Sequence, residues 1–359
     1  MMVDYLTVEL PDAVRVPVNG GHVAKVRPDG SVEWATACRR DLRGSWSSNM
    51  TVRAIASSHR EGDGKFGHTG RKLRESGLEL QGNPAKFLSG HNLFGSDCVV
   101  DLLDRTLASV LPAIYPDLPE LPRIDVREGR VARIDLTGSW LLDRESDVLP
   151  TLRAMEERIY CPYRGRGVQR DIGTLYYGLV DKGKRAKAWQ LKLYAKGLEV
   201  MVHKLPQPAY GVDGLMDELK RTIRVELTLR TEELKRLGMS QVSDWTRERV
   251  RAVWEQYVGK LDFSDGHVNL DVNELAAAGI KHRLRDAIAA WKSGNDMRVG
   301  RSPATFSRLR KQIREATGYD IATVMPKSNV VPLRRVVELV PATRPAWADQ
   351  LDRVLREAA

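Results

Sequence analysis

In RTIRVELTLR, residues 221–230, apolar and polar side chains alternate along most of the segment. Successive side chains of a β-strand point to opposite faces, so this alternation predicts a strand with one apolar and one polar face. The apolar set is Ile223, Val225, Leu227 and Leu229, and the polar set is Arg224, Glu226, Thr228 and Arg230. Five more strands are predicted at YLTVEL (5–10), GLELQ (77–81), VARIDLTG (131–138), GTLYYG (173–178) and WQLKLYAKG (189–197).

Helical segments separate the predicted strands. One helix is predicted over residues 98–115, with Asp97 as its N-cap, and another over residues 146–160. This mixed order predicts an α+β fold in which helices flank a central antiparallel sheet. The pattern becomes helical after residue 240, which predicts a sheet domain at 1–240 and a basic helical domain at 241–359 that ends in an irregular, proline-interrupted tail.

The predicted helical domain contains helices at residues 246–258, 272–294 and 302–318. Asp271 or Asn273 is expected to cap the second helix, and Ser302 with Pro303 is expected to start the third. The second and third helices have the outline of a helix-turn-helix. Six basic residues and no acidic residue lie within 298–314, as expected of a helix that lies on DNA, although solvated basic helices are also common.

Composition and charge exclude several classes of protein. The chain has 359 residues and a net charge of +10, and residues 281–359 hold 16 Lys and Arg against 8 Asp and Glu. This surplus predicts a polyanionic partner. No apolar run is long enough for a membrane span and the N-terminal segment lacks a signal-peptide pattern, so a cytoplasmic protein without a membrane partner is expected. Three widely spaced cysteines predict free thiols.

The polar faces of the predicted strands carry residues suited to phosphate chemistry. They are Glu79, Arg133, Asp135, Lys192, Tyr194, Lys196, Arg224 and Glu226. Carboxylate oxygens and a neutral imidazole are suitable ligands for Mg²⁺ or Mn²⁺, which polarises a phosphate as a Lewis acid. The candidate imidazole is His91, within PAKFLSGHNLFGSD (84–97), where Gly90 and Gly95 are expected to turn the backbone. The plainer alternative is a solvated sheet face and a core histidine.

A tyrosine beside such an ion can attack a phosphodiester, and a nearby lysine favours the phenolate and holds the phosphate. Tyr194 is the preferred nucleophile because Lys192 and Lys196 flank it on the same predicted face. Tyr176 and Tyr177 remain alternatives on a neighbouring strand, where they point to opposite faces.

Several of these segments, in this order, resemble the replication initiators of filamentous bacteriophages, the gene II product type. They are GNPAKFLSGHNLFGSD, VARIDLTGSW, TLYYG with LKLYAKGLE, TIRVELTLRTEELKRLG, and YDIATVMPKSNVVPLRRVVELVPATRPAW. The likeness extends over residues 77–347, and its most specific parts are PAKFLSGHNLFG and NVVPL…RPAW.

The resemblance implies a rolling-circle endonuclease with a Rep-like fold, related to the HUH nucleases. Such an enzyme recognises the double-stranded phage origin, nicks one strand with a tyrosine and a divalent metal, and later rejoins the displaced single strand. Its further partners would be a host helicase and a host DNA polymerase, in the host bacterial cytoplasm. The sequence has no G-x-x-x-x-G-K-[ST] motif, which fits the need for a separate helicase. An oligomer on DNA stays open, as do the origin sequence and the choice of metal.

The resemblance implies a metal site at the histidine of GHN, the aspartate of RID and the acid of R-x-E, which are His91, Asp135 and Glu226. It places catalysis at Tyr194, with Lys196 beside it in Y-x-K. The usual HUH signature has two histidines around one hydrophobic residue, and this sequence has no such pair. Asn92 or an acid must therefore complete the site, and Glu79 and Glu226 compete for that place.

DNA contacts are predicted at Lys192, Arg133, Arg224, Arg301, Arg308, Arg310 and Lys311. Arg133 and Arg224 could instead pair with the carboxylates next to them, and one of the two is expected to form a structural ion pair. Two other functions stay open: a non-catalytic, site-specific DNA-binding protein, such as a prophage relic or repressor, and a relaxase or transposase with the same chemistry.

Overall fold

The structure is a computed structural model. It describes residues 1–11, 18, 21–46, 48–57, 74–180, 184–185, 188–261, 275–276, 279–317, 320–322, 340–341 and 343–358.

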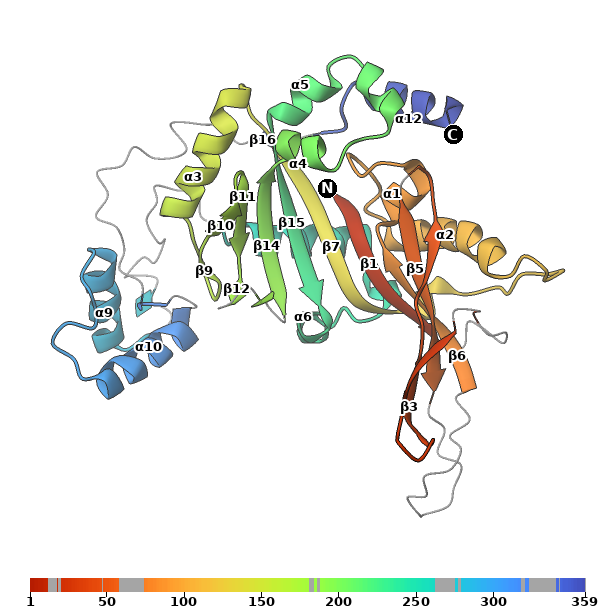
Figure 1. The fold of residues 1–359 in the computed structure, drawn as a ribbon. Coiled ribbons are helices and arrows are strands. Elements are labelled where there is room, and N and C mark those ends of the chain that lie inside the picture. The colour runs from red at the N-terminus through yellow and green to blue at the C-terminus, as the bar shows by residue number, and fades with distance from the viewer. Residues whose placement is uncertain are drawn as a thin grey trace.

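One large antiparallel sheet dominates the described part of the chain (Figure 1). Its strands run in the order β10-β11-β14-β15-β7-β1-β6-β5-β4, and β16 also pairs with β7. Their bounds are β1 Met2–Pro11, β4 Arg40–Arg43, β5 Asn49–Ser57, β6 Arg74–Gly82, β7 Arg130–Leu141, β10 Val168–Asp171, β11 Thr174–Tyr177, β14 Trp189–Ala195, β15 Thr222–Arg230 and β16 Val340–Pro341. Each of the six predicted strands is present, so the α+β class with a central antiparallel sheet is confirmed. The closer likeness to HUH nucleases stays a prediction.

Short two-stranded ribbons and helices complete the fold. The ribbons are β2 (His22–Val26) with β3 (Val32–Ala37), β8 (Tyr160–Cys161) with β9 (Gly165–Arg166), and β12 (Leu179–Val180) with β13 (Lys184–Arg185). The α-helices are α1 Pro84–Ser89, α2 Val99–Ile114, α3 Val148–Arg158, α4 Lys196–Val202, α5 Leu215–Lys220, α6 Thr231–Leu237, α7 Arg247–Val258, α9 His282–Lys292, α10 Pro303–Thr317 and α12 Ala348–Glu357. The 3-10 helices are η1 Val126–Glu128, η2 Glu145–Asp147, η4 Gln207–Gly211 and η5 Val242–Asp244.

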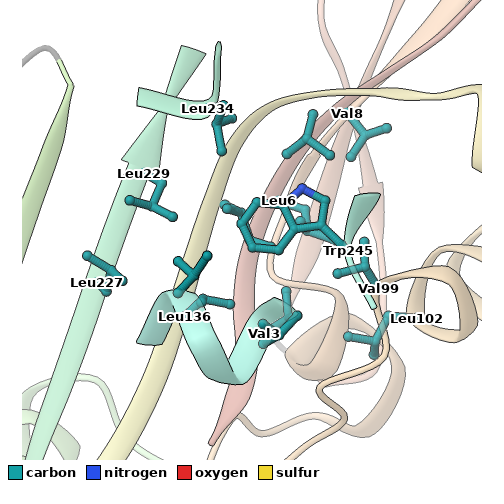
Figure 2. Close-up of a cluster of buried hydrophobic side chains, with 14 of the residues drawn as sticks. Val3, Leu6, Val8, Val99, Leu102, Leu136, Leu227, Leu229, Leu234 and Trp245 are labelled. Carbon is teal, nitrogen blue, oxygen red and sulfur yellow. The ribbon is translucent and has the colours of Figure 1, made fainter. Parts of the chain in front are cut away.

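The apolar faces of the strands build the main core, as their alternation predicted. Figure 2 shows the centre of this core, where side chains from β1, β7 and β15 meet α2 and a tryptophan that follows η5. They include Leu6, Val8, Leu136, Leu227, Leu229, Val99, Leu102 and Trp245. On β7, Gly138 permits close packing of α7, because a Cβ atom there would lie 2.5 Å from Trp254 Cζ2. The opposite face of the sheet is therefore left for polar side chains.

Helices α9 and α10 form a separate packing unit beside the sheet (Figure 1). Its buried residues include Ile288, Trp291, Met297, Leu309 and Ile313. Helix α7 packs in the main core, whereas α12 packs in a third cluster with α5 and the segment after α4. The division into a sheet domain at 1–240 and a helical domain at 241–359 stays a prediction. In the described ranges, no helix is both long enough and apolar enough to cross a bilayer.

Two helix starts and the C-terminal tail differ from the prediction. Helix α2 has Cys98 rather than Asp97 at its N-cap position. The predicted helix over 272–294 is interrupted, since Gly279 has φ 72° and α9 begins only at His282. The two proposed caps of that helix, at 271 and 273, lie outside the described residues. The tail predicted to be irregular ends in helix α12.

Other local predictions are confirmed. Helix α10 begins at Pro303, and the Ser302 hydroxyl accepts a hydrogen bond from the Thr305 amide at 3.3 Å. Gly90 ends α1 with φ 79°, which turns the backbone before His91. The three cysteines are free thiols.

Candidate functional site

A tyrosine, a glutamate and a lysine meet on the polar face of β14 and β15. Antiparallel pairing sets Lys192 opposite Glu226, with Tyr194 two residues further along β14. The Tyr194 hydroxyl donates a hydrogen bond to Glu226 Oε1 at 2.8 Å, and Lys192 Nζ donates to Oε2 of the same carboxylate at 3.3 Å. Lys192 Nζ also lies 4.1 Å from the centroid of the Tyr194 ring. The structure therefore brings three of the predicted site residues into direct contact.

Burial keeps the Tyr194 phenol protonated at rest. The side chain is 3% exposed, and burial, followed by the nearby charge of Glu226, raises its pKa well above the usual value. The lysines were expected to favour the phenolate, but the cation that opposes this shift is Arg224, and desolvation outweighs it. A nucleophilic role would therefore require the phenol to lose its proton during the attack, and Glu226 is positioned to accept it.

The two alternative tyrosines lie on opposite faces of β11, as predicted. Tyr176 pairs with Lys192 of β14 and therefore shares its polar face. Tyr177 is 0% exposed in the main core, where its hydroxyl donates to the Met155 carbonyl at 3.1 Å. Burial raises the Tyr177 pKa well above its usual value. Of the two alternatives, Tyr176 alone shares the polar face with Lys192.

Asp135 on β7 forms the predicted structural ion pair. Arg133 Nε lies 2.9 Å from Asp135 Oδ1, and Arg133 Nη2 lies 2.5 Å from Oδ2. The same guanidinium stacks on the Tyr5 ring, with 4.2 Å between Cζ and the centroid. Burial raises the pKa of Asp135 to about 6; Arg133 opposes the shift, and the charge of Glu226 adds to it. The guanidinium of Arg133 is thus bound to the Asp135 carboxylate.

Arg224 on β15 has a different environment. It is 2% exposed, and its Nη2 lies 3.7 Å from Asp4 Oδ1 and 3.6 Å from Met2 Sδ. Asp4 Oδ1 accepts hydrogen bonds from the side-chain amides of Asn83 at 2.6 Å and Asn92 at 2.9 Å. The carboxylate that pairs with Arg224 is thus already hydrogen-bonded to two amides.

Lys196 opens helix α4 instead of continuing strand β14, which corrects its predicted place on the strand. Its Nζ still lies 6.0 Å from the centroid of the Tyr194 ring and donates to Glu199 at 2.6 Å. Burial and the neighbouring Arg224 lower the Lys196 pKa, while Glu199 opposes that shift. Lys196 is therefore near the tyrosine but held mainly by Glu199.

His91 is held by the C-terminal helix. Its Nδ1 accepts a hydrogen bond from the Leu93 amide at 3.3 Å, and its Nε2 lies 3.4 Å from Asp352 Oδ1 of α12. An acceptor Nδ1 leaves the ring proton on Nε2, facing Asp352. The ring is 2% exposed and lies 4.6 Å from the Phe94 ring, and burial lowers its pKa. Both ring nitrogens of His91 therefore have partners within the protein.

Glu79 on β6 lies between two arginines. It accepts hydrogen bonds from Arg39 Nη2 at 3.1 Å and from Arg53 Nη2 at 2.5 Å. Strand β6 is separated from β15 by β1 and β7 in the sheet order, so Glu79 and Glu226 are not neighbours. Glu79 does not join the carboxylate that Tyr194 contacts.

The contacts of the four predicted metal ligands determine whether they could bind an ion together. In the described ranges, no three His, Cys, Asp or Glu side chains are grouped so that they could hold a metal ion. The predicted ligands instead contact Asp352, Arg133, Tyr194 and the pair Arg39 and Arg53. As arranged, this donor set does not fit a metal, and its geometry assigns no chemical step to one.

The predicted DNA-binding residues of α10 and its preceding loop divide into two groups. Arg301, Arg308 and Lys311 are exposed. Arg310 forms two hydrogen bonds with Asp320, at 2.7 and 2.6 Å, within the helical unit. The connection between α9 and α10 spans residues 293–302, longer than the 3–4-residue turn usual in a helix-turn-helix. The helix pair is confirmed, and its assignment as a helix-turn-helix stays a prediction.

Sequence reasoning missed several residues of this region. Asp4, Asp352 and the two arginines beside Glu79 had no local signal, since their partners lie far away in the chain. The largest separation is between His91 and Asp352, at 261 residues. Thr137 could have been found, because it follows Asp135 at the two-residue spacing of one strand face.

Comparison with known proteins identifies the family. Residues 2–248 match the N-terminal region of the family of replication-associated proteins of the gene II product type. The chain is also 33% identical over 361 residues to the replication-associated gene II protein of Enterobacteria phage I2-2, with 98% of this chain and 97% of that protein covered. The predicted resemblance to filamentous-phage replication initiators is confirmed. The chain therefore belongs to the family of phage replication-associated gene II proteins.

Proposed function

We propose that the chain starts rolling-circle replication of a filamentous phage genome by nicking one strand of the double-stranded origin with Tyr194. Initiators of this family nick DNA, which supports an endonuclease. The observation that carries the proposal is the 2.8 Å hydrogen bond from the Tyr194 hydroxyl to Glu226. A hydroxyl bonded to a positioned base is the arrangement expected of an activated nucleophile.

In the proposed reaction, Tyr194 Oη attacks a DNA phosphorus while its proton passes to Glu226. The bond from Oη to phosphorus forms, the bond from phosphorus to the 3′ oxygen breaks, and the released 3′ oxygen takes a proton from water. The hydroxide left by that water is neutralised by the proton held on Glu226. Lys192, 3.3 Å from Glu226, supplies positive charge beside the phosphate as negative charge develops. The products are a 5′-phosphotyrosine and a free 3′ hydroxyl.

The same residues can run the reaction backwards to join the displaced strand. A phosphotyrosine conserves the energy of the phosphodiester, so attack by a 3′ hydroxyl restores the DNA backbone and returns the proton to Tyr194. The initiator would thus both nick and close the circle.

Replication initiator nucleases of this kind are in general metal-dependent. Mg²⁺ or Mn²⁺ is the proposed ion, because hard divalent cations prefer oxygen ligands such as phosphate and carboxylate. No step is assigned to the ion, since the predicted ligands have other partners in this structure.

The proposed partners are the origin duplex, read by α10, and the displaced single strand. A host helicase would separate the strands and a host polymerase would extend the 3′ hydroxyl, in the cytoplasm of the bacterial host. An oligomer could form on the origin.

The test is a nicking assay on a supercoiled plasmid that carries the cognate phage origin, in Mg²⁺ or EDTA. The denatured reaction is then analysed for a covalent protein–DNA adduct. Wild type should give the adduct, and Tyr194→Phe should give none, because it keeps the ring and removes the nucleophile. The matched control is Tyr210→Phe, which changes a tyrosine on η4 that is 39% exposed.

Other outcomes would assign the function differently. Adduct formation that persists in Tyr194→Phe and is lost in Tyr176→Phe would identify Tyr176 on β11 as the nucleophile. Origin binding without nicking by wild type, in either divalent ion, would indicate the non-catalytic DNA-binding protein. Nicking of a transfer origin or transposon end, with no nicking of the phage origin, would indicate a relaxase or transposase.

A further inference from the structure

A pocket of 240 Å³ lies beside the Tyr194 centre and is partly built by the C-terminal segment. Its polar lining includes Thr137, Ser139, Lys196, Arg224 and Arg344. Arg224 is the cross-strand partner of Tyr194, and Thr137 is the cross-strand partner of Glu226. Two pocket residues are therefore cross-strand neighbours of the proposed nucleophile and base, although Tyr194 and Glu226 do not themselves line the pocket.

Two buried polar atoms belong to residues that line this pocket. Within the described residues, Arg224 Nε and Thr137 Oγ1 are buried and have no hydrogen-bond partner. A buried donor without a partner is costly, and native proteins leave few of them. A guanidinium N–H can only donate, and a hydroxyl can donate as well. An oxyanion is the kind of group that accepts hydrogen bonds from both types of donor.

The acids around the pocket are already bonded. Asp4 accepts from two side-chain amides, Glu199 accepts from Lys196, and Glu218 accepts from Trp347 Nε1 at 3.0 Å. The contact between Arg224 and Asp4 is 3.7 Å, longer than a hydrogen bond. Among the described residues, Arg224 thus has an ion pair with Asp4 but no carboxylate at hydrogen-bond distance.

The C-terminal segment forms part of the pocket wall. Strand β16 pairs with the end of β7, and Thr343, Arg344 and Trp347 then line the pocket. The Arg344 guanidinium stacks on Phe94 at 4.5 Å and pairs with Asp349 at 2.8 Å and Asp352 at 3.3 Å. Met1 and Met2 also line the pocket, so residues from both ends of the chain contribute to its walls.

We infer that this pocket binds a backbone phosphate of the DNA strand next to the nick, with Arg224 and Thr137 as donors and the C-terminal segment as its outer wall. The inference rests on the proposed function for the identity of the ligand as DNA. A phosphate held here would fix the register of the strand relative to Tyr194, because cross-strand pairs connect the two places.

The experiment measures binding of a short fluorescein-labelled oligothymidylate to the full chain by anisotropy, in EDTA and over a range of KCl concentrations. Thr137→Val keeps the shape of the side chain and removes the hydroxyl. Its matched control is Thr151→Val on α3, since Thr151 Oγ1 is also buried without a partner in the described residues but does not line the pocket. Arg224→Met removes the charge, and its folding is checked by thermal unfolding.

Thr137→Val should weaken binding about tenfold relative to Thr151→Val, the size expected for one hydrogen bond to a charged group. Arg224→Met, where it folds, should reduce the slope of log K against log salt by about 0.7, the value for one single-strand phosphate contact. Inorganic phosphate should compete with the oligonucleotide more strongly than chloride at equal ionic strength.

Equal affinities for Thr137→Val and Thr151→Val would overturn the inference. Competition by inorganic phosphate that Thr137→Val abolishes, with unchanged oligonucleotide affinity, would assign the pocket to a free anion and also overturn it. Because binding is measured in EDTA without nicking, the outcome is independent of whether Tyr194 is the nucleophile.

Discussion

The polar face of the large sheet and the helix pair α9–α10 both carry basic residues, but they place them differently. On the sheet, Arg224 and Lys196 are each 2% exposed and lie among carboxylates, whereas Arg308 and Lys311 of α10 are exposed to solvent. Buried charges act on groups at fixed positions, while exposed charges attract a polyanion over longer distances and are screened by salt. This difference is consistent with the two proposed roles, chemistry on one phosphate at the sheet and binding of a duplex by α10.

The largest effect expected from this comparison concerns the two glutamates on the sheet. Glu226→Gln should slow nicking by about 10²- to 10⁴-fold, the usual contribution of a general base, because the amide cannot accept the tyrosine proton. Glu79→Gln should leave the nicking rate unchanged, because Glu79 contacts Arg39 and Arg53 instead. Single-turnover nicking at saturating protein measures both. An equal loss in the two variants would show that Glu79 belongs to the site.

The next effect concerns His91 and the docking of α12. His91→Ala should weaken the attachment of α12 by about 2 kcal/mol, since a buried ring and its contact with Asp352 are lost. Limited proteolysis should then cleave the C-terminal segment faster, with little change in the concentration of Mg²⁺ needed for nicking. A strongly raised Mg²⁺ requirement, with the C-terminal segment as protected as in wild type, would instead make His91 a metal ligand.

A smaller effect is expected from α10. Arg308→Gln combined with Lys311→Gln should weaken origin binding about tenfold and reduce the salt slope by about 0.9 for each lost phosphate contact. The nicking rate at saturating protein should not change. The control is Arg105→Gln, which removes one exposed positive charge from α2 instead of from α10. A loss of nicking rate without a loss of affinity would place these residues at the catalytic centre.

The smallest effect is a pH dependence of stability that comes from Asp135. Its folded-state pKa of about 6 lies above the usual 3.8, so the folded protein binds this proton more tightly than the unfolded chain does. Stability should therefore fall as the pH rises from 4 to 6, by about 1 kcal/mol per pH unit. Urea unfolding of wild type and Asp135→Asn across this range measures it. The same slope in both proteins would assign the dependence to another group.

The sequence alone determined the strands and the faces of their side chains. Alternation in β15, β7 and β14 put Glu226, Asp135 and Tyr194 on polar faces, because the two-residue period of a strand is a local property of the backbone. The start of α10 at Pro303 also followed from local chemistry, since a serine N-cap followed by a proline at the first helical position favours a helix start. Family membership could likewise be inferred from the order of short segments.

Only the tertiary structure decided which charges meet. Glu79 looked equivalent to Glu226 in sequence, yet strand order gives one of them two arginines and the other a tyrosine and a lysine. The partner of His91 lies 261 residues away on α12, and no local pattern encodes a contact at that separation. The long-range packing of the chain sets the desolvation and the neighbours of each charge, and these determine what each charge can do.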